Sequence, residues 1–130
     1  GVNIATNDVI ELCVLPADHV LIDWMLLNDD FDSAGTLTIK IGHIAGTPGN
    51  ANRVLADVGV ELLASGSTVL QAPAVTRGSV VASIAGMRTM ATPSGADRSI
   101  GLGVVAGPTN PATVRQLDFL MFYRWQRYGG

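Results

Sequence analysis

Apolar and polar residues alternate along several short stretches of the chain. In Leu37–Ile41 the first, third and fifth residues are apolar and the residues between them are polar. Ile100–Val104 repeats the pattern, with glycines at the intervening positions. A period of two is what a strand with one buried face requires, so both segments are predicted to be strands.

A longer extended segment, 117–126, lies near the C-terminus. One row of its side chains is Leu117, Phe119, Met121, Tyr123 and Trp125, and the other is Asp118, Leu120, Phe122, Arg124 and Gln126. Because both rows are apolar in the middle, we expect both faces of this strand to be covered.

Turn-forming residues separate further extended segments. Val9–Leu15 ends at Pro16, and His19–Leu27 ends at a polar run of Asn and Asp. Thr68–Gln71 and Ser79–Ile84 are two more strand candidates. Gly, Pro, Asn and Ser gather between the candidates, at 46–52, 65–67, 92–96 and 107–111. Many short strands joined by turns favour an all-β sandwich or barrel over a βαβ fold.

One segment has helical spacing instead. Val54, Leu55, Val58 and Leu62 lie on one face of a helix over 53–63, with Asn52 as its N-cap and Ser65-Gly66 as its stop. We expect a short helix there, in a crossover between strands.

The composition agrees with one soluble domain spanning 1–130. The chain has 130 residues, of which 48% are apolar and only 15% charged, and its mean hydropathy is +0.35. This length is enough for one self-sufficient core. The charged fraction lies below the roughly 25% of an average globular protein, which indicates a surface that is covered in a larger assembly.

Several classes of function are disfavoured. The net charge is −3 and Lys40 is the only lysine, so no basic stripe is available to bind nucleic acid. No apolar run reaches the ~20 residues that cross a bilayer, and the first residues lack the pattern of a secretory signal. We therefore expect no membrane partner. The single cysteine, Cys13, forms no internal disulfide and is expected to be a small buried hydrophobe in a protein made in a reducing cytoplasm.

No catalytic or metal site emerges from the motifs. Asp29, Asp30 and Asp32 resemble the start of a calcium loop, but the twelfth position is Ile41 instead of glutamate, so a solvated acidic turn is expected. His19 and His43 have no ligand partners at suitable spacing. The Gly-x-Gly-x-x-Ala pattern at 101–106 lies inside an alternating strand, which favours close backbone approach over dinucleotide binding. We expect no cofactor and no enzymatic activity.

The C-terminal segment has the composition of a contact surface. Five of the seven aromatic residues lie within 119–128, interleaved with Arg124 and Arg127. Tyr, Trp, Arg and Met are enriched at the centres of protein interfaces. An N-terminal arm, 1–8, and a C-terminal tail, 124–130, are predicted to contact a partner, because chain ends that are not held by a strand can order on a partner surface. The predicted contact residues are Val2, Asn3, Ile4, Arg124, Trp125, Arg127 and Tyr128.

The first third of the chain resembles a known class of protein. A strand, then the turn Leu15–Val20 into a second strand, then Asp30–Gly42, resembles the capsid cement or decoration proteins of tailed bacteriophages. The remainder is similar in its general strand layout.

The resemblance implies a jelly-roll-like β-sandwich that binds the outside of an assembled phage head without catalytic residues. Its partner would be the major capsid protein of the same virion, and the protein would be made in the host cytoplasm. Self-association is expected, as a twofold dimer first and a trimer second. The helix over 53–63 departs from the layout and leaves the strand order open.

Two other classes of function remain. A tail, spike or head-fibre module with a glycan-binding sandwich would fit the same strand pattern. A small hydrolase or a cupin-like metalloprotein fits less well, because a cupin site needs several histidines with a carboxylate and the chain has two histidines.

Overall fold

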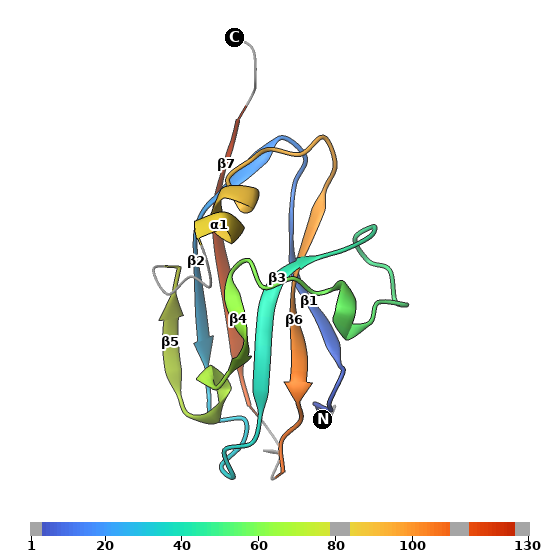
Figure 1. Ribbon diagram of the computed structural model, residues 1–130. Helices are drawn as coiled ribbons and strands as arrows, with labels where there is room; N and C mark the ends of the chain where they lie inside the picture. Colours follow the sequence, from blue (N-terminus) through green and yellow to red (C-terminus); the bar gives the residue numbers. More distant parts are fainter. Residues whose placement is uncertain (1–3, 79–83, 110–114, 127–130) are drawn as a thin grey trace.

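The chain forms a sandwich of two antiparallel β-sheets (Figure 1). The computed structural model describes residues 4–78, 84–109 and 115–126. One sheet has the order β1-β6-β3-β4, from Val9–Leu15, Arg98–Ala106, Thr38–Ile44 and Leu63–Ser67. The other has the order β5-β2-β7, from Ala74–Arg77, His19–Asn28 and Leu117–Trp125. The predicted all-β sandwich is confirmed. The jelly-roll order is not, because a jelly roll has eight strands and the described residues form seven.

Strands predicted from alternation are found where expected. The predictions over 9–15, 19–27, 37–41, 100–104 and 117–126 correspond to β1, β2, β3, β6 and β7. The prediction over Thr68–Gln71 is wrong, because Val69–Gln71 is a turn of 3-10 helix, η2. Of the candidate Ser79–Ile84, residues 79–83 lie outside the described residues, and Ile84 begins α1, Ile84–Met90. Strands β4 and β5 were not predicted.

The helix predicted over 53–63 is also wrong. Only Leu55–Asp57 is helical, as the 3-10 turn η1, and β4 begins at Leu63. The backbone between them follows the edge of β3, where the amide of Gly59 donates to His43 and that of Leu62 donates to Ile41, at 2.8 and 3.1 Å. Pairing with β3 outweighs the local helical spacing, because it buries Val58 and Leu62 while satisfying the backbone.

The core lies between the two sheets. Trp24 and Leu26 from β2 meet Ile39 and Ile41 from β3 and Leu102 from β6, all essentially buried. The Trp24 ring stacks on Phe119 of β7, with centroids 6.0 Å apart. This packing fixes which side of β7 faces inward.

Gly101 lies at a close approach between neighbouring strands. A Cβ atom on this residue would come 2.7 Å from the carbonyl oxygen of Ile10 in β1 and would collide with Ile44 in β3. Residues 98–106 continue as the strand β6, so the close-approach interpretation of the glycine motif is confirmed.

The acidic turn before β3 differs from expectation. Asp32 is fully buried, and its Oδ2 accepts hydrogen bonds from the amides of Thr36 and Leu37 and from the Thr36 hydroxyl, at 2.7–2.8 Å. The amide of Ala34 donates to Oδ1 at 3.2 Å. A solvated turn was predicted, but the buried Asp32 carboxylate instead holds the backbone of the loop through these hydrogen bonds.

Candidate contact surface

Strand β7 lies at an edge of the three-stranded sheet and pairs with β2. Its inner row, Leu117, Phe119 and Met121, packs against the core. Its outer row is exposed, with 42% of Leu120 and 46% of Phe122 open to solvent. The expectation that both faces are covered is therefore wrong for the isolated chain, because the core lies on one side of this sheet only.

Exposed apolar side chains extend from β7 across the same face of the sheet. We call this surface the outer face and define it by Ile22, Val75, Leu120 and Phe122. Val75 on β5 and Ile22 on β2 are more than half exposed. Ile22 falls at an irregularity in the pairing of β2 with β7, where Leu21 pairs with Tyr123 and Asp23 with Phe122. An extra residue of this kind bulges out of the ladder and lets an apolar side chain reach solvent.

Part of the predicted C-terminal tail belongs to β7. Arg124 and Trp125 pair with Val20 and His19 of β2, and both are exposed. The ring of Tyr123 meets that of His19 edge-on, with centroids 5.3 Å apart. The sheet thus holds the first two residues of the tail, while Arg127 and Tyr128 lie outside the described residues.

The predicted N-terminal arm is tied to β6 along its described part. The amide of Asn7 donates to Val104, and the amide of Val104 donates to Asp8, both at 2.9 Å. Ile4 packs against the core. Val2 and Asn3 lie outside the described residues.

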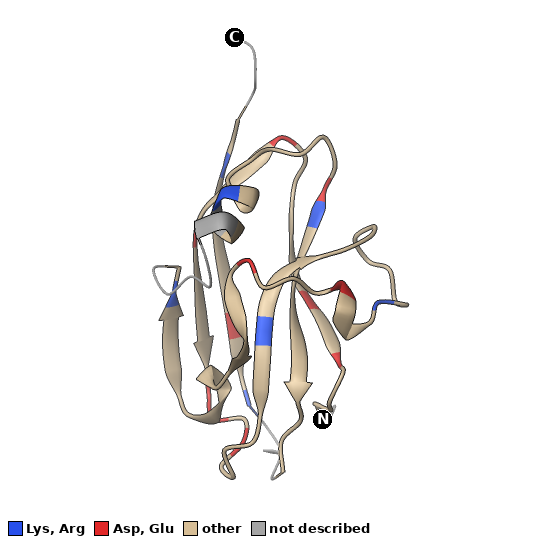
Figure 2. Cartoon of the chain, viewed as in Figure 1, with Lys and Arg blue, Asp and Glu red and all other residues tan. Residues whose placement is uncertain are grey.

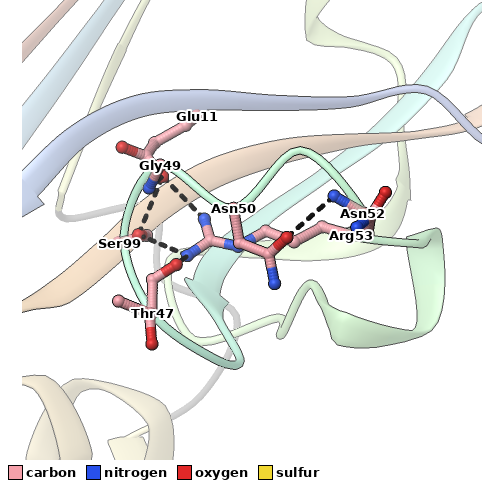
Figure 3. Close-up of polar contacts among 7 residues, drawn as sticks. All are labelled: Glu11, Thr47, Gly49, Asn50, Asn52, Arg53 and Ser99. Atoms are coloured by element: carbon pink, nitrogen blue, oxygen red, sulfur yellow. Dashed lines mark hydrogen bonds and ion pairs between the residues drawn. The ribbon is translucent and has the colours of Figure 1, made fainter.

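A polar cluster that the sequence did not reveal lies at β1 (Figure 3). Arg53 reaches Oε2 of Glu11 at 2.6 Å and the hydroxyl of Ser99 at 2.9 Å, and it also donates to the carbonyl of Thr47. The amide of Gly49 donates to Glu11 at 3.0 Å. The Gly49 amide lowers the pKa of Glu11, with further lowering by Ser99 and Arg53, against a smaller opposing effect of burial. The cluster clamps loop 45–54 onto β1 and β6, and the long separations of its members in sequence left no local signal.

Burial shifts the pKa of several ionisable groups among the described residues. Within the described ranges, no three His, Cys, Asp or Glu residues lie close enough to hold a metal ion. Burial lowers the pKa of His43 and raises that of the Cys13 thiol to about 11. Figure 2 shows the charged residues dispersed over the described part of the chain, many of them in loops. No helix among the described residues is long and apolar enough to span a membrane.

Comparison with known proteins gives one informative similarity. A chain in the solved capsid of Ralstonia phage GP4 has the same fold, with a TM-score of 0.80 and 33% sequence identity, and the match covers 98% of this chain and 78% of that one. This chain belongs to the family of that phage capsid protein. As a capsid-family protein it has a structural role in a virus, which confirms the phage part of the resemblance noted in the sequence. No protein-family model and no curated protein matches the chain.

Proposed function

We propose that the protein is a capsid cement, or decoration, protein that binds the outer surface of a phage head across the seams between capsomers. The observation that carries the proposal is the outer face of the β5-β2-β7 sheet. Several large exposed apolar side chains on one face of a sheet mark a surface that binds another protein. The major capsid protein of the same virion is the proposed partner, which puts the protein on the capsid surface.

The proposed mechanism is physical. A copy that contacts two shell subunits makes its second contact at high effective concentration, so modest interfaces add up to strong attachment. Opening a seam under the pressure of packaged DNA must then also break cement contacts. The terminal residues Val2, Asn3, Ile4, Arg124, Trp125, Arg127 and Tyr128 are proposed to add contacts with the capsid or with a second subunit.

Self-association is part of the proposal. A homodimer with twofold symmetry is the first expectation and a trimer the second, because closed symmetric contacts prevail among soluble homo-oligomers. An oligomer multiplies the capsid contacts of one particle and so strengthens the bridging of seams.

The test uses a pair of valines with matched exposure. Val75 on the outer face is 59% exposed, and Val54, before η1, is 58% exposed. Purified wild-type protein, Val75→Lys and Val54→Lys are added to phage heads that lack the protein. Co-sedimentation measures binding, and the temperature at which DNA is released measures stabilisation.

We expect wild-type protein and Val54→Lys to bind and to raise the release temperature, and Val75→Lys to bind at least about tenfold more weakly, since a charge would be buried at the contact. Heads of equal stability with and without the protein would refute the cementing role. Equal binding by both variants would refute the assignment to the outer face. Glycan binding by the isolated protein, without head binding, would favour a tail or fibre adhesin.

A further inference from the structure

Strand β7 is an edge strand with few of the usual protections, and its two charges, Asp118 and Arg124, lie near its ends. Natural sheets blunt their edges with lysine, proline, bulges or very short strands. The nine residues of β7 include neither lysine nor proline, and in its pairing with β2 the extra residue lies in β2. An edge of this length with apolar side chains on both faces is suited to pairing with another strand.

The sequence of β7 is complementary to itself. If two copies of β7 pair antiparallel about a twofold axis at Met121, Asp118 of one copy lies opposite Arg124 of the other. Leu120 then lies opposite Phe122 on the same outer face. On the inner face, the opposed pairs are Phe119 with Tyr123 and Leu117 with Trp125. Every pair in this register is either apolar or of opposite charge, the two combinations that stabilise neighbouring strands.

Other symmetric registers lose this match. Moving the axis to Leu120 puts Asp118 opposite Phe122, and moving it to Phe122 puts Asp118 opposite Gln126. In the isolated chain both charged side chains are exposed and make local contacts only among those described, Asp118 with Gln116 at 2.8 Å and Arg124 with Gln126 at 3.3 Å. Both charges are therefore accessible to a second copy.

We propose that two copies of the chain associate through β7, antiparallel and centred on Met121, to form one continuous sheet of the order β5-β2-β7-β7-β2-β5. Edge pairing leaves the outer faces uncovered and joins them into a single larger surface. The inference rests on the self-association proposed above, and it assigns the strand and the register. Its geometry does not depend on what the outer face binds.

The test is a charge exchange followed by size-exclusion chromatography with light scattering. Asp118→Arg and Arg124→Asp each put like charges opposite one another at two places in the dimer. At roughly 1 kcal/mol for each place, either single variant is expected to raise the dimer dissociation constant about ten- to thirtyfold. The double variant recreates both opposite-charge pairs and is expected to return to the wild-type constant. Circular dichroism verifies that each variant is folded.

Arg77→Asp is the matched control. Arg77 is exposed and lies on β5, the opposite edge of the same sheet. Edge pairing through β7 predicts that Arg77→Asp leaves the dimer dissociation constant unchanged. An increase in this constant as large as that of the β7 variants would refute edge pairing and favour packing of the two outer faces against each other. A double variant as weak as the single ones would refute the register. A wild-type protein that is monomeric at all accessible concentrations would refute self-association, and the head-binding test would still decide the capsid role.

Discussion

Replacing the buried carboxylate of Asp32 tests whether this side chain holds the loop before β3. Its two oxygens accept four hydrogen bonds from residues 34–37, three of them on Oδ2. In Asp32→Asn the side-chain oxygen can take the place of Oδ2. The side-chain NH2 group then takes the place of Oδ1 and faces the backbone N–H of Ala34. Two donors would be opposed in a fully buried site.

The expected cost follows from these contacts. Hydrogen bonds to a charged group contribute about 1 kcal/mol more than neutral ones, so weakening the three bonds at Oδ2 costs about 3 kcal/mol. Loss of the longer bond from Ala34 adds up to about 1 kcal/mol. For a chain of this length, a loss of about 3 kcal/mol lowers the melting temperature by about 10 °C.

Urea and thermal unfolding of Asp32→Asn and Asp30→Asn provide the measurement. Asp30 is the matched control, because its carboxylate accepts one backbone hydrogen bond, from the amide of Asp32 at 2.9 Å, and is partly exposed. We expect the control to lose less than about 1 kcal/mol. If Asp32→Asn were no less stable than Asp30→Asn, the carboxylate would not be organising the loop.

Three further predictions follow from single side chains. Gly101→Ala should lower the free energy of unfolding by about 1–3 kcal/mol in urea titrations, because the added methyl group would collide with the Ile44 side chain and the Ile10 carbonyl oxygen. Gly95→Ala, with open space around its Cβ position, should leave the free energy of unfolding unchanged. Glu11 has a lowered pKa in the folded state, so its contribution of about 1 kcal/mol is present above its ordinary pKa of 4.5 and is lost as the pH falls below it. Unfolding curves of wild type and Glu11→Gln should therefore differ at pH 6 and converge near pH 3, and a constant difference would contradict this. Burial raises the pKa of the Cys13 thiol to about 11, so a thiol reagent at pH 8 should label the folded protein about 100-fold more slowly than the urea-unfolded chain, and equal rates would contradict it.

The strands were predictable to the extent that their signal is local. Alternation located β1, β2, β3, β6 and β7, because neighbouring side chains of a strand point to opposite faces whatever the strand pairs with. It failed for β4, where LASGS shows no alternation, and for 53–63, where helical spacing was overridden by pairing with β3.

The candidate surface was predictable in its residue types but not in its extent. The aromatic and arginine residues near the C-terminus indicated contact, and Leu120, Phe122 and Trp125 are indeed exposed. The contributions of Ile22 and Val75 became visible only in the folded chain, because β5 and β7 are far apart in sequence and come to lie on either side of β2. The polar cluster around Glu11 could not be predicted either, because its members are also far apart in sequence.

The sequence by itself determined that the chain is an all-β sandwich with few charges and a C-terminal strand apolar on both rows, since these are properties of composition and of side-chain period. The tertiary structure decided that Asp32 is buried, that 53–63 follows β3, and that the outer row of β7 remains open at an edge. Those outcomes depend on which distant strands pair and on which side the core forms. Local pattern specifies neither, because hydrogen bonding and burial are satisfied by the whole chain together.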